Sequence, residues 1–129
     1  MSRRLWLCLP PLIFALLDYV VTMRGQPVEY WSGNYDAAFE ANPIVRWCMT
    51  AHPLMFHLLT VVWIAAFSVF ILKTPRAPAR FASLAIAFSH AFCIGTWLYY
   101  SGDSFFRPMA LCIACAILMV MALELSGDV

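Results

Sequence analysis

Apolar residues gather in long runs along this chain, and short polar segments separate the runs. Four runs are prominent, and they cover residues 5–23, 54–72, 81–100 and 108–125. Each approaches the roughly 20 residues that an α-helix needs to cross the hydrocarbon core of a bilayer. Because only a short turn joins the third and fourth runs, neighbouring helices must be antiparallel. The pattern predicts an all-α membrane protein with four antiparallel transmembrane helices, forming a single module over residues 1–129.

The first run begins after Arg3 and Arg4 and ends before Arg24, an arrangement that a secretory signal peptide also shows. No small-x-small cleavage site follows the run. As a helix it would be about 28 Å long, which is enough to span a bilayer. We therefore interpret it as an uncleaved signal anchor.

The composition agrees with a membrane protein and excludes other classes. Hydrophobic residues make up 64% of the chain and charged residues 12%, against roughly 45–50% and 25% in soluble domains. The net charge of +1, without a basic cluster, excludes nucleic acid as a partner, because phosphate binding needs concentrated Lys and Arg. Five cysteines are an odd number and four lie in apolar runs, so we expect no disulfide framework; only Cys48 should meet water.

Basic residues near the ends of the runs predict the orientation of the chain. Basic residues in short loops favour the cytoplasm, so both termini are predicted cytoplasmic, in a cell membrane such as the bacterial inner membrane. The predicted cytoplasmic set is Arg3, Arg4, Lys73, Arg76 and Arg80, and the predicted outer set is Arg24, Arg46 and Arg107.

The one long connection, residues 25–53, predicts a structured outer loop, because loops of this length are seldom idle in small proteins. We expect one or two short interfacial helices across the mouth of the bundle, with Asn34 or Asp36 as a cap and a restart at Asn42-Pro43. Glu40 lies in this loop and is either a solvated carboxylate or a group folded back over the bundle. An aromatic belt is expected at the outer boundary, formed by Trp31, Trp47, Trp97, Tyr99 and Tyr100.

Three ionisable residues lie inside the predicted spans, where each needs a protein partner or water. Asp18 lies about a turn and a half below the outer end of the first span, and Thr22 follows on the same helical face. His57 lies at a similar depth in the second span. His90 lies in the third span beside a stripe of small residues that should face the bundle interior, namely Ser83, Ala87, Ala91 and Gly95.

These residues define a predicted polar cluster in the outer half of the bundle, consisting of Asp18, Thr22, Glu40, Asn42, His57 and His90. Two carboxylates and two imidazoles, Asp18, Glu40, His57 and His90, are ligand types for zinc or iron. They show no recognised metal spacing such as H-E-x-x-H, and structural hydrogen bonds or a proton relay would use the same residues.

Two short motifs carry a resemblance to a family. Asp18-x-x-x-Thr22 and Glu40-x-Asn42-Pro43, followed by His52-Pro53-x-x-Phe56, resemble the small bacterial membrane proteins grouped as DUF5658. The resemblance covers roughly the first 70 residues and implies that Asp18, Thr22, Glu40, Asn42 and Pro43 act together. The family often has a lysine near the start of the second helix, where this chain has His57, so an ion pair there is replaced by a group that can bind metal or carry a proton.

These observations lead to three functional hypotheses. The first is a non-enzymatic subunit or accessory factor whose polar cluster locks the outer loop onto the bundle and binds an ion or partner. The second is a membrane-embedded, metal-dependent enzyme acting on a lipid or lipid-linked substrate, and the third is proton-coupled transport. A bundle this slim is expected to enclose no large cavity, and therefore to form a homo-oligomer or join a larger membrane complex.

Overall fold

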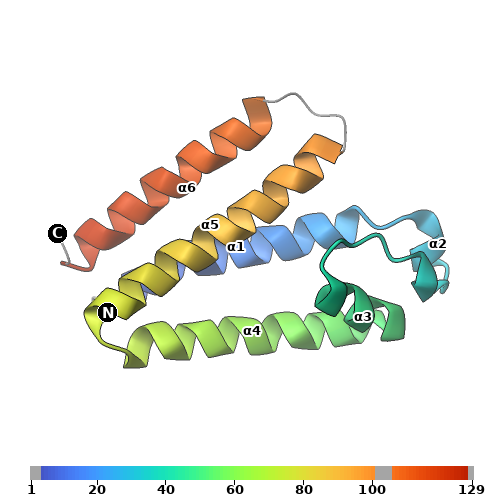
Figure 1. The fold of residues 1–129 in the computed structure, drawn as a ribbon, viewed down its shortest axis with the longest axis horizontal. Helices are drawn as coiled ribbons and strands as arrows, with labels where there is room; N and C mark the ends of the chain where they lie inside the picture. The colour runs from blue at the N-terminus through green and yellow to red at the C-terminus, as the bar shows by residue number, and fades with distance from the viewer. Residues whose placement is uncertain (1–3, 101–105, 128–129) are drawn as a thin grey trace.

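The computed structural model describes residues 4–100 and 106–127, and the described residues form helices and connections without a strand. Four long helices and three short ones follow one another along the chain (Figure 1). They are α1 (Leu5–Arg24), α2 (Val28–Trp31), the 3₁₀ turn η1 (Tyr35–Ala37), α3 (Pro43–Ala51), α4 (Pro53–Lys73), α5 (Arg76–Tyr100) and α6 (Phe106–Leu125). The four long helices correspond to the four apolar runs.

Helix α5 begins five residues earlier than the sequence pattern indicates, at Arg76 instead of residue 81. The helix accommodates Pro78 in its first turn, where a backbone N–H has no intrahelical partner in any case. Pro75 separates this start from Thr74, the C-cap residue of α4. The connection between α4 and α5 is therefore very short.

Helices α1 and α5 form the centre of the bundle, and α4 and α6 lie on opposite sides of this pair (Figure 1). The stripe of small residues on α5 faces inward as predicted, because Ser83, Ala87 and Ala91 are buried. Both described chain ends lie at the end of the bundle where α4 connects to α5, which we call the terminal end. The opposite end carries α2, η1 and α3, and α4 and α5 separate toward it.

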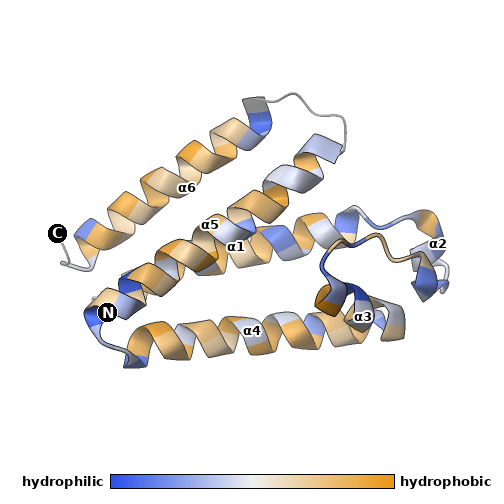
Figure 2. Ribbon diagram, viewed as in Figure 1, coloured by the Kyte–Doolittle hydropathy of each residue, from blue (hydrophilic) through white to orange (hydrophobic). Residues whose placement is uncertain are grey.

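The outward surface of the long helices is apolar. Large side chains such as Val61, Phe81 and Phe92 are between 65% and 73% exposed. Figure 2 shows mainly hydrophobic colours along the four long helices, hydrophilic colours near several of their ends, and a mixture of both in the α2–α3 segment. Soluble proteins rarely expose an apolar surface of this extent, whereas lipid tails cover it well. All four long helices are long and apolar enough to cross a membrane.

Helix α1 continues through Pro10 and Pro11, although proline has no N–H to donate. The missing donor of Pro11 leaves the Leu7 carbonyl without its usual partner four residues later. The Ser83 hydroxyl of α5 donates to this carbonyl at 2.6 Å, in a fully buried position. A side chain of α5 therefore satisfies a backbone group that α1 cannot satisfy itself, as an apolar environment requires.

The terminal end gathers basic residues. One guanidinium nitrogen of Arg4 donates to the carbonyls of Leu72 and Thr74, both at 3.0 Å. The carbonyls at the C-terminal end of a helix have no partner within the helix, and Arg4 supplies one for α4. Lys73 and Arg76 flank the same turn. Arg3, which the sequence analysis assigned to the cytoplasmic set, lies outside the described residues.

The segment between α1 and α4 is folded, and it contains α2, η1 and α3 where the sequence predicted one or two short helices. Asn34 precedes η1 but makes no side-chain capping hydrogen bond, so the predicted cap is wrong. Asn42 caps α3, because its side-chain oxygen accepts from the N–H groups of Ile44 and Val45. The expectation that Cys48 meets water is wrong, since α3 turns this residue and Met49 toward the bundle and both are buried. The five cysteines are free.

Candidate functional site

A cavity of about 1230 Å³ lies between α1, α4 and α5 at the end away from the termini, and the residues from Asp36 to Arg46 cover it. Its volume exceeds the roughly 300–1,000 Å³ that is typical of ligand pockets. The sequence led us to expect no large enclosed cavity, and the bundle instead carries a large hollow that is partly open. Helices α4 and α5 diverge toward this end, where the segment between α2 and α4 lies (Figure 1).

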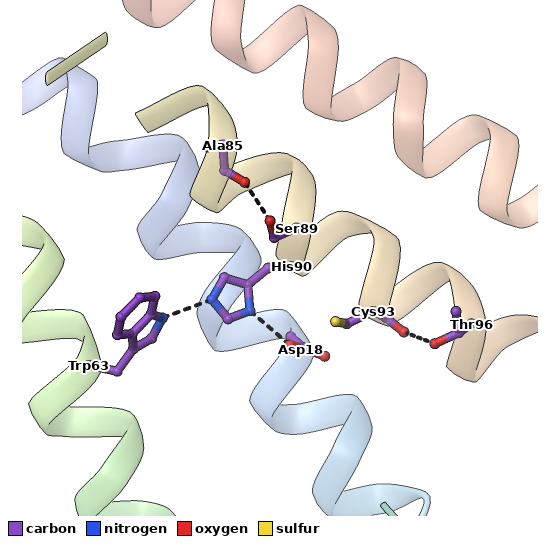
Figure 3. Close-up of polar contacts among 7 residues, drawn as sticks. All are labelled: Asp18, Trp63, Ala85, Ser89, His90, Cys93 and Thr96. Atoms are coloured by element: carbon purple, nitrogen blue, oxygen red, sulfur yellow. Dashed lines mark hydrogen bonds and ion pairs between the residues drawn. The ribbon is translucent and has the colours of Figure 1, made fainter. Parts of the chain in front are cut away.

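Asp18, His90 and Trp63 form a hydrogen-bonded chain across α1, α5 and α4 (Figure 3). His90 Nδ1 lies 2.8 Å from Asp18 Oδ2, and Trp63 Nε1 lies 3.1 Å from His90 Nε2. The side chains of His90 and Asp18 are 19% and 16% exposed, so both are largely withdrawn from the surface. These two hydrogen bonds link three helices that line the cavity.

The hydrogen bonds of this chain define the tautomer of His90. An indole nitrogen only donates, so His90 Nε2 must accept and carries no proton. Nδ1 then carries the proton and donates to the Asp18 carboxylate. His90 is therefore a neutral imidazole with both nitrogens occupied, which holds Asp18 in position and leaves His90 no free nitrogen for acid–base work.

Glu40 lies over the bundle in the lining of the cavity and is half-buried, so it combines features of both alternatives left open by the sequence. It lines the cavity and its Oε1 accepts from the Asn42 N–H at 2.7 Å. Burial raises the pKa of the Glu40 carboxyl above its usual 4.5, the hydrogen bond from Asn42 opposes that rise, and the charge of Asp18 adds to it. Two carboxylates from distant parts of the chain therefore act on each other at one cavity.

Gln26 attaches the covering segment to the end of α1. Its side-chain Oε1 accepts from the Phe39 N–H at 2.8 Å, and its Nε2 donates to the Phe39 carbonyl at 3.0 Å and to the Thr22 carbonyl at 2.9 Å. The Gln26 residue is 6% exposed. A buried amide with its hydrogen bonds made is a rigid connection, so Gln26 determines where Glu40 lies.

Trp97 of α5 closes the far side of the cavity. Its ring packs edge-on against Phe39 of the covering segment, with centroids 5.6 Å apart. It also packs directly on Gly25, where an added Cβ would lie 2.3 Å from the ring. Trp97 therefore belongs to the cavity wall, whereas Trp31 and Trp47 are exposed as the predicted aromatic belt requires.

The structure brings together five of the six residues of the predicted polar cluster, since Asp18, Thr22, Glu40, Asn42 and His90 all line the cavity. His57 has a different partner, because its Nδ1 lies 3.1 Å from the hydroxyl of Tyr19. Six residues separate it from Trp63 on α4, which is about 9 Å along the helix axis.

The metal site predicted from Asp18, Glu40, His57 and His90 stays a prediction. Within residues 4–100 and 106–127, no group of three or more His, Cys, Asp or Glu is arranged to hold a metal ion. To bind one, His90 would have to release Trp63 or Asp18, whereas His57 could offer Nε2 while its Nδ1 stays bonded to Tyr19.

A second hollow, of about 470 Å³, continues along the α4–α5 face toward the terminal end. Trp63 lines both spaces. The other side chains of the second hollow are apolar, namely Ala66, Phe67, Phe70, Pro78, Phe81, Ala82 and Ile86. A cavity that contains several polar side chains and a groove lined by apolar side chains therefore share one lining residue.

Sequence reasoning missed Trp63, Gln26 and Trp97 as parts of this site. Trp63 and Trp97 resemble ordinary residues of an apolar run, and Gln26 resembles an ordinary loop residue. The neighbouring Gly25 carried one usable signal. A glycine at the end of a long helix often marks a place where another segment approaches closely. Nothing in the pattern names the partner of that glycine.

Comparisons of the chain with protein-family models, with curated proteins and with solved structures found no match. The resemblance to DUF5658 therefore stays a prediction that rests on its two short motifs. The motif residues Asp18, Thr22, Glu40 and Asn42 nevertheless surround a single cavity. This geometry gives the motifs a physical connection that does not depend on the family.

Proposed function

We propose that this chain is a small multi-pass membrane protein that takes an amphiphilic molecule from the bilayer into the cavity beneath its α2–α3 segment. In this arrangement the four long helices cross the membrane in alternating directions, both termini are cytoplasmic, and the cavity opens in the outer half. One observation carries the proposal: a cavity lined by carboxylates joins an apolar groove on the α4–α5 face at Trp63. An amphiphile has the same division into a polar group and an apolar chain.

Three features support entry from the side. Helices α4 and α5 separate toward the cavity, and α4 buries little of its surface against its neighbours. Trp63, where the two spaces meet, is 45% exposed. The amphiphile would lay its chain along the groove and extend its polar group past Trp63. A non-enzymatic binding or accessory role needs nothing further from the site, and a homo-oligomer or larger complex would present this face to a partner.

The test is photo-cross-linking in nanodiscs that contain phosphatidylethanolamine, phosphatidylglycerol and phosphatidylcholine with a photoreactive group in the acyl chain. We expect cross-links concentrated on α4 and α5 around Phe70, Phe81 and Ile86. Thr96→Trp, which fills the cavity, should abolish this concentration. Ile113→Trp, on the exposed face of α6, is the control and should leave it unchanged. Cross-links spread evenly over all lipid-facing helices would contradict the proposal.

A second candidate, an enzyme acting on a lipid or lipid-linked substrate, is favoured by Glu40. A carboxyl with a raised pKa beside a second carboxylate is a typical general acid. The candidate predicts that bilayer lipid incubated with the protein is converted, and that Glu40→Gln stops the conversion while the amphiphile still binds. The predicted zinc or iron would act here, and elemental analysis of protein purified without chelator tests for it.

A further inference from the structure

Helical hydroxyl groups in this protein usually bond to their own backbone. The side chains of Thr60, Thr74 and Ser89 each donate to the carbonyl four residues earlier, at 2.7–2.9 Å. Ser83 departs from this pattern by donating to the Leu7 carbonyl of α1, and Ser68 and Thr22 also make no such bond. The Thr22 hydroxyl makes no hydrogen bond to residues 4–100 or 106–127, although the residue is only 4% exposed and lines the cavity. The hydroxyl faces the cavity, so its hydrogen-bond partner there is water or a ligand.

Two further acceptors face the same cavity. Only Oδ2 of Asp18 is used by His90, and within the described chain Oδ1 has no hydrogen-bond partner. Asp18 lies one helical turn from Thr22, so the two side chains share a face of α1. Glu40 approaches from the covering segment, close enough for the charge of Asp18 to act on it. The cavity lining therefore presents oxygen acceptors from three side chains, with Glu40 half-buried.

The charges around these acceptors favour a cation. Asp18, Glu40 and Asp36 line the cavity, and Arg46 is the one basic residue in its lining. Arg46 and Asp36 are exposed at the rim, where water screens their charges. His90 adds no charge because its Nε2 accepts from Trp63. An anionic headgroup would therefore meet carboxylates in the cavity lining.

From this arrangement we propose that the cavity recognises the protonated primary amine of an amphiphile, with Asp18, Thr22 and Glu40 as its acceptors. A primary ammonium has three N–H donors and no acceptor, which matches three oxygen atoms. The aromatic walls formed by Tyr19 and Trp97 add attraction for a cation. The inference rests on the proposed function and specifies the headgroup that the amphiphile carries.

Equilibrium dialysis of radiolabelled decylammonium against protein in phosphatidylcholine nanodiscs tests the inference, with empty nanodiscs measuring simple partitioning. Decyl sulfate, decyltrimethylammonium and decanol compare the headgroups, and ethanolamine tests an amine without a chain. We expect saturable binding of decylammonium at least about tenfold tighter than of each comparison compound, because hydrogen bonds to charged groups are among the strongest.

Variants test whether the proposed acceptor residues bind the amine, or whether any negative charge on the protein attracts it. Glu40→Gln and Thr22→Val should each weaken decylammonium binding, by about tenfold and several-fold. Gln at residue 40 can still accept from the Asn42 N–H, so the covering segment should keep its fold. Glu29→Gln is the matched control, because Glu29 is exposed in α2 outside the cavity lining, and it should leave the affinity unchanged.

Each outcome has one meaning. Tight decylammonium binding that Glu40→Gln and Thr22→Val weaken supports the inference. Equal binding of all the decyl compounds, abolished by Thr96→Trp, overturns the amine inference and leaves the proposed amphiphile binding intact. Ethanolamine binding as tightly as decylammonium overturns the requirement for a chain. Absence of saturable binding by every compound overturns both proposals.

Discussion

The long helices pack differently at the two ends of the bundle. At the terminal end, Leu7, Ile71 and Ala79 are no more than 1% exposed and pack against one another. The carbonyl left over by Pro11 receives the Ser83 hydroxyl, and Arg4 binds the last carbonyls of α4. At the other end the same helices separate around a cavity of about 1230 Å³.

The difference is the reason that our proposed binding role is assigned to the cavity end. Close packing maximises dispersion contacts, and a hollow forfeits them. The cavity end also keeps the Thr22 hydroxyl and two carboxylates in a space that apolar side chains could fill. A protein retains such a costly arrangement where a ligand or reaction uses it. The substitutions predicted below each perturb one end of the bundle.

The largest effect is expected from Gly25→Ala, which attacks the closure of the cavity end. The added Cβ would lie 2.3 Å from the Trp97 ring, so the ring or the end of α1 must move. We expect the free energy of unfolding, measured by SDS titration in mixed micelles, to fall by about 2–3 kcal/mol. Gly95→Ala is the control, because its Cβ would meet Pro108 at an ordinary 3.7 Å. Equal stability of the two variants would contradict the close contact.

The next effect concerns the terminal end. Ser83→Ala leaves the Leu7 carbonyl buried without a donor, which should lower the free energy of unfolding by about 1–2 kcal/mol. Pro11→Ala restores the N–H that α1 lacks, so the cost of Ser83→Ala should shrink in a Pro11→Ala background. A double-mutant cycle measures this coupling. Purely additive effects would show that Ser83 does not compensate for Pro11.

A smaller effect is expected from Trp63→Phe, which removes the donor to His90 Nε2. One interhelical hydrogen bond in a membrane protein contributes on the order of 1 kcal/mol. The sharper measurement is ¹⁵N NMR of His90. Wild-type protein should show a protonated Nδ1 and an unprotonated Nε2, and the variant should allow Nε2 to take a proton. A wild-type His90 protonated on Nε2 would refute the hydrogen-bonded chain.

The smallest effect is a dependence of stability on pH that comes from Glu40. Its pKa in the folded protein is raised above 4.5 by burial and by Asp18, so the folded state holds the proton more tightly than the unfolded state. Glu40 therefore contributes stability below pH 4.5 that is lost as the pH rises through the raised pKa. Thermal unfolding at a series of pH values measures it, with Glu40→Gln as the variant that should remove this component. An unchanged profile in Glu40→Gln would assign the dependence to another group.

Much of the architecture could be predicted because it follows from local pattern. Four apolar runs specify four long helices, since a buried backbone in lipid must satisfy its own hydrogen bonds. Asn42-Pro43 specifies the start of α3 through capping and the fixed φ of proline. The small residues of α5 specify the face that packs against α1. The early start of α5 was missed because proline in a first turn looks like a break.

The candidate site could be predicted only in part. Asp18 and His90 stood out because ionisable groups inside a span need partners, and Glu40 stood out by its motif. Their partners could not be read from the chain: Trp63 lies 27 residues from His90, and Asp18 lies 72 residues from it. His57 has the same chemical character as His90, yet Tyr19 is its partner. The rotation of each helix, which depends on all its neighbours, decides between them.

The sequence by itself determined the number of long helices, their apolar character and the set of polar residues from which a site could be built. These properties follow from composition and periodicity, which act over a few residues. Only the tertiary structure decided that α4 and α5 diverge, that Gln26 holds Glu40 over the bundle, and that a cavity separates them. Such features depend on contacts between residues far apart in the chain, whose geometry no local pattern encodes.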